Sequence, residues 1–182
     1  HSHGISNGPK FNNPVENRNR HMIKTELCEK QNIQLLQIFE NEWINEKQNK
    51  IWKSIINSKL NKNTKVFVRK CYIKEVDYKT TANFLEDNHI QGACVSYINY
   101  GLYYNNELMS IMTFGKSRFS KEYEWELIRF CNKININVVG GASKLLKHFE
   151  KNNNPLSIVS YANRRWSNGK LYKTLNFEHT HN

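Results

Sequence analysis

The chain has 182 residues, of which 27 are Lys or Arg and 16 are Asp or Glu, and 38% are hydrophobic. This length and composition suffice for one or two compact domains and exclude a wholly disordered chain. The longest purely apolar runs, such as Val138-Val139, span a few residues, far below the ~20 residues of a membrane-spanning helix. We therefore expect a soluble protein without a membrane partner.

The four cysteines are Cys28, Cys71, Cys94 and Cys131, and they lie dozens of residues apart. No C-x-x-C pair is present, which excludes a zinc knuckle or a thiol redox motif of the usual spacing. This pattern indicates free thiols in a reducing compartment, and we expect a cytoplasmic protein.

The net charge of +11 divides into +4 for residues 1–63 and +7 for residues 64–182, so both halves are basic. Such a surplus predicts a polyanionic partner. Nucleic acid is the commonest one, because neutralising phosphates releases counterions and supplies affinity independent of sequence. A basic surface that serves only solubility is the alternative.

Periodicity in the first sixty residues predicts a helix, a strand and a second helix. Residues 1–14 have the composition of a loop, and residues 16–31 place Met22, Ile23, Leu27 and Cys28 on one helical face. The apolar run 33–39 predicts a buried strand, residues 40–43 an acidic turn and residues 44–60 a helix. The polar stretch 61–64 predicts a linker and a domain boundary.

The remainder predicts a mixed α and β domain. Alternation over 97–104 and 107–114, joined by Asn105-Asn106, is the strongest hairpin pattern in the chain. The other expected elements are strands over 65–76, 123–131 and 156–161, helices over 78–88, 143–151 and 167–175, and a last strand beginning at Phe177. The fold class is α+β or α/β.

Residues 1–60 resemble the end of a very-short-patch-repair-like nuclease domain of the PD-(D/E)XK superfamily, as in phage homing endonucleases. The segments that carry the resemblance are His1-Ser2-His3, residues 16–21 and IQLLQIFENEW at 33–43. It implies hydrolysis of DNA phosphodiesters with Mg²⁺ and a general-base role for His1. It implies no metal ligand within these residues, so we expect this chain not to cut DNA. A plain chain terminus is the alternative for His1.

Residues 65–182 resemble the GNAT acetyltransferase superfamily, whose GNAT-like domains follow nucleases in phage homing-endonuclease proteins. The segments that carry the resemblance are YGLYYNNELMSIMTFG, YEWELIRFC, NVVGGASKLLKHF and SIVSYANRRWSNGKLYKTLNF. It implies a mixed sheet flanked by helices, here without its last strand. It further implies an acetyl-CoA pyrophosphate turn at Gly140, Gly141, Ala142 and Ser143, and a general acid at Tyr172. A tight turn and a packed helix face explain the same residues without a cofactor.

Several residues have types suited to contacts with phosphates or bases. Arg18, Arg20, His21 and Lys24 fall within two turns of one predicted helix, and Arg164-Arg165-Trp166 places two guanidiniums beside an indole after a strand. A solvated helix face is the alternative for the first group, and core packing is the alternative for Trp166. His89 follows two carboxylates at a helix end and is a candidate acid or base. Closure of the helix by Gly92 explains the same sequence without catalysis.

These observations predict a double-stranded DNA partner and a DNA-binding fragment of a homing-endonuclease-like protein in a phage-infected bacterial cytoplasm. Two alternatives stay open. One is a GNAT-type acyltransferase that uses acetyl-CoA to modify a DNA base or an amine, and the other is a noncatalytic DNA-binding module.

Overall fold

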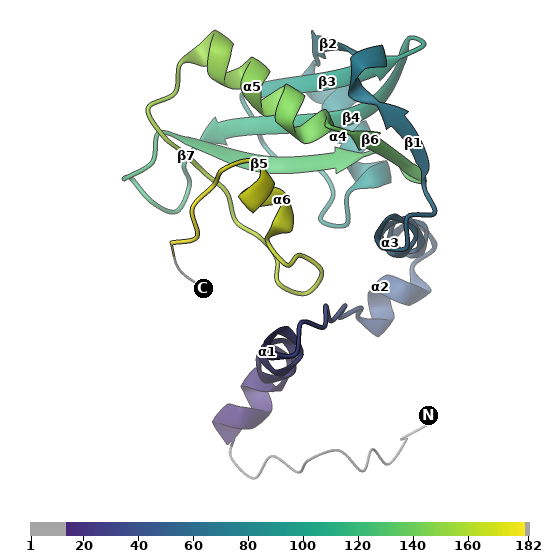
Figure 1. Ribbon diagram of the computed structural model, residues 1–182, viewed down its shortest axis with the longest axis vertical. Helices are drawn as coiled ribbons and strands as arrows, with labels where there is room; N and C mark the ends of the chain where they lie inside the picture. Colours follow the sequence, from purple (N-terminus) through teal and green to yellow (C-terminus); the bar gives the residue numbers. More distant parts are fainter. Residues whose placement is uncertain (1–13, 181–182) are drawn as a thin grey trace. The chain divides into compact units, whose positions relative to one another are not determined.

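The computed structural model describes residues 14–180, with side chains from Arg20 onward. The chain forms two compact units (Figure 1). The smaller unit contains the first helix, the segment up to Gln37 and residues Asn163–Asn168, and the larger unit contains Ile38–Ala162 and the chain from Gly169. Across residues 14–180, no helix combines the length and the apolar character needed to cross a membrane.

The larger unit is built on a five-stranded mixed sheet of order β2-β3-β4-β5-β7. Its strands are β2 (Tyr72–Glu75), β3 (Ile98–Tyr104), β4 (Glu107–Lys116), β5 (Trp125–Asn132) and β7 (Ile158–Val159). Neighbouring strands are antiparallel except β5 and β7, which are parallel. The predicted hairpin is confirmed, because Asn105 and Asn106 both have positive φ, at 50° and 63°, as a tight two-residue turn requires.

Helices cover both faces of this sheet, which makes the larger unit α+β (Figure 1). On one face α5 (Gly141–Asn153) buries Leu145 and Phe149, and the ring of Phe149 stacks on that of Phe114 with centroids 3.7 Å apart. On the other face α4 (Tyr78–Asn88) packs Leu85 against Ile111. Both helices agree closely with the prediction because each has a regular apolar stripe.

A second, two-stranded parallel sheet joins β1 (Thr64–Phe67) to β6 (Ile136–Val139). The short 3-10 helix η1 (Val68–Lys70) separates β1 from β2. The strand predicted over 65–76 is therefore two strands in different sheets. No strand was predicted over β6, because its residues alternate too briefly to distinguish from a loop before the glycine turn.

The C-terminal part of the larger unit contains less helix and less strand than predicted. The last helix, α6, spans only Lys170–Thr174, and residues 177–180 form no strand. Leu175 and Phe177 pack against the main core instead, so their apolar character reflects packing and not strand pairing.

The smaller unit contains α1 (Pro14–Lys30), whose existence was predicted. Its predicted buried face is wrong, because Met22 and Leu27 are exposed and Ile23 and Cys28 are half-buried. Among the described side chains of α1, Thr25 is the buried one. The strand predicted over 33–39 is wrong. These residues pair with no strand within residues 14–180. Instead the Gln37 N–H donates to the Arg165 carbonyl at 2.9 Å, and Gln34 Nε2 donates to the Trp166 carbonyl at 3.1 Å.

The compact units separate after Gln37 and not at the predicted linker 61–64. After the two short helical segments α2 (Glu40–Ile44) and α3 (Glu46–Lys59), residue Asn63 is buried and donates from Nδ2 to the Ser54 carbonyl. Ser54 Oγ in turn accepts from the Asn135 N–H at 2.8 Å. These bonds tie α3 to the larger unit, so the polar sequence at 61–64 marks a tight, hydrogen-bonded turn.

Candidate nucleic-acid interface

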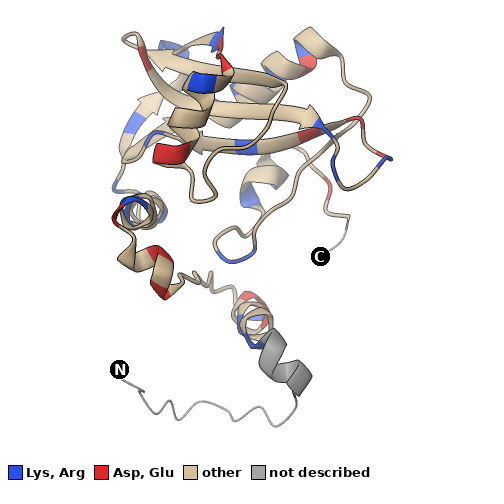
Figure 2. Cartoon of the chain, turned by 180° about the vertical axis from the view of Figure 1, so that it is seen from behind, with Lys and Arg blue, Asp and Glu red and all other residues tan. Residues whose placement is uncertain are grey.

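Residues 46–75, which we call the basic segment, account for most of the net positive charge of the protein. They contain nine Lys or Arg residues and two Glu residues, a net charge of +7 out of +11. All nine cations are exposed, and they are Lys47, Lys50, Lys53, Lys59, Lys62, Lys65, Arg69, Lys70 and Lys74. Figure 2 colours the Lys and Arg positions along the chain blue. A continuous stretch of α3, β1, η1 and β2 in the larger unit therefore presents most of the surplus positive charge.

Carboxylates neutralise little of this charge. Within residues 20–180, the ion pair of the basic segment is Lys47 Nζ to Asp87 Oδ1 at 3.0 Å, and both side chains are at least half exposed. Three other cations lie over aromatic rings. Lys53 Nζ is 5.9 Å from the Trp43 ring centre, the Arg69 guanidinium is 5.4 Å from that of Phe67, and Lys74 Nζ is 5.2 Å from that of Tyr72. Such contacts orient the cations without cancelling their charge.

The local fold explains why these side chains reach solvent. Helix α3 begins where Asn45 Oδ1 accepts from the Gln48 N–H at 3.0 Å, an N-cap that fixes its first turn. Its inner side buries Ile51, Trp52 and Ser54. The lysines occupy the remaining circumference, as the amphipathic pattern of a surface helix requires.

The basic segment also reaches the start of α5, where the sequence predicted a pyrophosphate turn. Lys144 Nζ donates to the Val68 carbonyl at 3.2 Å and to the Cys71 carbonyl at 2.6 Å, which fastens η1 to the first turn of α5. The exposed Arg69 and Lys70 therefore lie close to a helix N-terminus, and both features attract anions.

Packing explains the two glycines of this turn. Gly140 has φ +81°, and a Cβ there would lie 3.0 Å from Val68 Cγ1. A Cβ on Gly141 would lie 3.1 Å from Val138 Cγ1 and 3.2 Å from Leu102 Cδ1. Gly141 and Ala142 are buried and Ser143 is half-buried. The residues predicted to bind a cofactor are therefore also explained by the alternative, a tight turn before a helix.

Strands β5 and β7 pair over two positions, Trp125 with Ile158 and Glu126 with Val159. Ser160 Oγ then donates to the Leu127 carbonyl at 2.9 Å, which continues the contact by one residue. The register of β4 and β5 shifts between Thr113 and Phe114, beside the point where β7 leaves. A bulge of this kind bends a strand and often accompanies a functional opening.

His89 is half-buried in the larger unit. Its Nδ1 accepts from the Gln91 N–H at 3.1 Å, and burial followed by the positive charge of Arg129 lowers its pKa to about 3. His89 is therefore neutral at neutral pH. The carboxylates that precede it are engaged elsewhere, since Asp87 pairs with Lys47 and Glu86 Oε1 accepts from the Ala93 N–H at 2.8 Å.

Arg129 shares this interior. Its Nη1 donates to the Ile128 carbonyl at 2.9 Å, and its Nε has no hydrogen-bond partner among the described residues. Cys131 is half-buried on the same strand, and loss of solvation raises the pKa of its thiol. His89 and Arg129 thus form a half-buried basic pair, which the sequence did not indicate.

The smaller unit brings the predicted residues of α1 together with residues 163–168, which we call the arginine turn. Arg164 Nη2 donates to Glu29 Oε2 at 2.8 Å, and its Nη1 lies 3.9 Å from Glu26 Oε1. The Arg165 guanidinium lies 5.1 Å from the Trp166 ring centre. Arg164 is therefore neutralised by carboxylates of α1, and this contact holds the turn to the helix.

The other predicted site residues do not converge on one place. Arg20, His21 and Lys24 are exposed on α1, while His1 and the side chain of Arg18 lie outside the described residues. Tyr172 is half-buried on α6, and its ring packs edge-on against Phe177 with centroids 5.8 Å apart. This contact fits the predicted alternative of a packed helix face.

No group of three or more His, Cys, Asp or Glu side chains that could hold a metal ion occurs in the described part of the chain. Comparison with protein-family models, with curated proteins and with solved structures finds no match to this chain. The functional assignment therefore depends on the charge and geometry of the residues themselves.

Sequence reasoning missed the basic segment, although its cations are visible in the sequence. Counting charge in two halves divides the segment at residue 63, so that neither half stands out. A sliding window of about thirty residues finds it, since residues 46–75 hold +7. The windowed count needs no structural knowledge.

Proposed function

We propose that this protein binds DNA through the basic segment. The observation that carries the proposal is that nine cations in thirty consecutive residues are all exposed, with a single ion pair among them in the described structure. Exposed lysines at this density bind the phosphate backbone without reading its sequence. The proposal agrees with the resemblance of the chain to phage homing-endonuclease proteins, which implies a DNA partner.

The test is a fluorescence anisotropy titration of labelled duplex DNA at several salt concentrations. We expect affinity to fall steeply with salt, because each cation that neutralises a phosphate adds about 0.9 to the slope of log affinity against log salt. The variant K62Q/K65Q/R69Q/K70Q should lower the affinity at low salt by at least about 100-fold and reduce the slope by roughly three units.

The matched control is K121Q/K147Q/K151Q/K173Q, which removes four other exposed lysines of the larger unit and makes the same change in net charge. We expect this control to lower the affinity far less. Equal losses in the two variants would show that DNA responds only to net charge, and the proposal would fail.

Acyl transfer is the second candidate function, and the glycine turn before α5 favours it. Helix α5 begins at the Gly140-Gly141 turn, which resembles the pyrophosphate turn of GNAT enzymes, and the exposed Arg69 and Lys70 would suit the phosphates of coenzyme A. The test is calorimetric titration with acetyl-CoA, with inorganic triphosphate as a control for anion binding. Saturable micromolar binding of acetyl-CoA alone supports this candidate, and equal heats for both ligands contradict it.

A further inference from the structure

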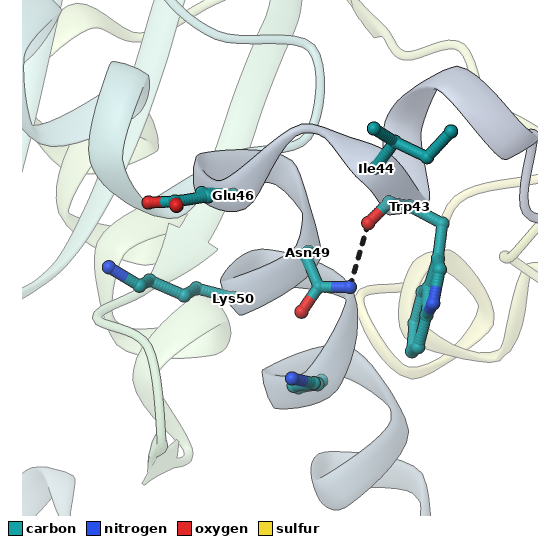
Figure 3. A pocket seen from close by; sticks show the side chains of 6 residues that line it. Trp43, Ile44, Glu46, Asn49 and Lys50 are labelled. Carbon is teal, nitrogen blue, oxygen red and sulfur yellow. Dashed lines mark hydrogen bonds between the residues drawn. The ribbon is translucent and has the colours of Figure 1, made fainter.

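A hollow of 310 Å³ lies at the corner between α2 and α3 in the larger unit (Figure 3). It is lined by one indole, one aliphatic side chain, one amide, one carboxylate and two ammonium groups, which belong to Trp43, Ile44, Asn49, Glu46, Lys50 and Lys53. Ligand pockets usually span about 300–1,000 Å³, so this hollow has room for a group of the size of one nucleobase.

Hydrogen bonds to backbone groups fix the shape of the hollow. Asn49 Nδ2 donates to the Trp43 carbonyl at 2.8 Å, and the Trp43 N–H donates to the Phe39 carbonyl at 3.0 Å. The Asn45 cap joins the two helices directly, since its N–H donates to the Asn41 carbonyl while its side chain starts α3. The backbone of Trp43 is therefore fixed at both of its polar groups.

Trp43 is 44% exposed and Ile44 is 72% exposed, so both offer apolar surface to a partner on a basic surface. Figure 3 shows the indole on one side of Asn49 and the side chains of Glu46 and Lys50 on the other. The aromatic surface and the cations thus share one small region, with Lys53 Nζ 5.9 Å from the ring centre.

We infer that this hollow stacks one unpaired nucleobase on the Trp43 indole while Lys50 and Lys53 hold the neighbouring phosphates. Base faces are covered in a duplex, so an exposed indole gains only from a base outside the stack. The charge of the hollow favours a nucleotide over an apolar protein segment, because its two lysines belong to the basic segment. The carboxylate of Glu46 repels phosphate, so the hollow itself favours the uncharged base.

The inference deepens the proposed function and rests on it. It predicts that the protein distinguishes single-stranded from duplex DNA at Trp43, whereas the basic segment alone would bind both through their phosphates. A region that both holds phosphates and stacks a base would stabilise an opened or frayed end of a duplex.

The experiment uses the full chain with a labelled single strand of about 12 nucleotides, a duplex of the same sequence, and a single strand that carries abasic sites. We expect Trp43→Ala to lower the affinity for the single strand roughly 5- to 100-fold and to change the duplex affinity less than about twofold. Trp43→Phe should restore most of the loss, since a phenyl ring still stacks. Tyr97→Ala is the matched control, because Tyr97 is an aromatic residue of the larger unit that is 71% exposed.

The abasic strand tests base stacking in the hollow even if the Trp43→Ala variant fails to fold. Binding of the normal strand should quench tryptophan fluorescence in the wild type, and the abasic strand should bind more weakly without that quenching. Equal binding of both strands, or equal losses for single strand and duplex in Trp43→Ala, would overturn the inference and leave the hollow to another partner such as a protein. Absence of all DNA binding would instead refute the proposed function.

Discussion

Cations have opposite surroundings in the basic segment and in the arginine turn. The nine cations of the basic segment are exposed and meet one carboxylate among the described residues, whereas Arg164 meets Glu26 and Glu29. The two adjacent arginines of the turn are the more conspicuous in sequence. A cation is therefore available to a phosphate only where the fold places no carboxylate next to it. The presence of neighbouring cations in the sequence does not predict whether this condition is met.

The largest expected effect concerns an arginine that is paired even more fully. Arg118 donates from Nε and Nη2 to the two carboxylate oxygens of Glu126, at 3.1 Å and 2.5 Å, and the Glu126 side chain is 2% exposed. Arg118→Ala should lower the free energy of unfolding by about 3–5 kcal/mol, because it leaves a buried carboxylate without its counterion.

Urea denaturation measures this loss, and Arg118→Lys should fall between the wild type and Arg118→Ala because it keeps the charge without the two-pronged geometry. Duplex DNA affinity should stay within about twofold. A stability loss below about 1 kcal/mol would place Arg118 with ordinary surface ion pairs.

The comparison extends through His89 to a basic group that is half-buried. Burial and Arg129 depress its pKa from 6.5 to about 3, so the folded protein keeps His89 neutral while the unfolded chain protonates it below pH 6.5. The unfolded state then binds more protons, and stability falls with decreasing pH by up to about 1.4 kcal/mol per pH unit between these two pKa values.

Urea denaturation of the wild type should therefore show a loss of up to about 2 kcal/mol between pH 6.5 and pH 5 that His89→Gln lacks. The difference between the two proteins isolates His89 from the carboxylates that also titrate. An identical pH dependence in both would contradict the burial of a neutral imidazole.

The arginine turn should acquire affinity for DNA once its carboxylates are removed. The variant E26Q/E29Q releases Arg164, so we expect duplex affinity to rise roughly two- to fivefold. The control E122Q/E150Q makes the same change in net charge at two exposed glutamates of the larger unit. A gain in the control equal to that in E26Q/E29Q would show that the release of Arg164 has no specific effect.

The smallest effect is expected for Arg164→Gln. Because Glu26 and Glu29 are 50% and 41% exposed, water solvates them once the arginine is gone, and the loss of stability should not exceed about 1 kcal/mol. Duplex affinity should change less than about twofold. A tenfold loss of DNA affinity would show that Arg164 contacts phosphate despite its two glutamates.

The sequence predicted those elements that local patterns determine. Helix α4, the turn at Asn105-Asn106 and the glycines before α5 depend on caps, positive φ and apolar spacing, all of which lie within a few residues. The segment 33–39 has the composition of a strand but pairs with no strand among the described residues, and only the fold reveals that. The exposure of Met22 and Leu27 likewise depends on contacts between distant parts of the chain.

The candidate site likewise has features that the sequence shows and features that only the fold shows. The charge of the basic segment is present in the sequence, but its exposure depends on α3 turning Ile51 and Trp52 inward. The pairing of Arg164 with Glu29 joins residues 135 positions apart, and no local pattern indicates it. Likewise, His89 follows α4 and Arg129 lies on β5, so their proximity could not be predicted.

The most direct test of the account is lysine footprinting by acetylation and mass spectrometry, with and without saturating duplex DNA. The account predicts strong protection of the lysines of the basic segment, above all Lys62, Lys65 and Lys70, and little protection of Lys121, Lys151 and Lys173. Uniform protection across the chain, or protection confined to Lys24 and Lys30 of α1, would contradict the assignment of DNA binding to residues 46–75.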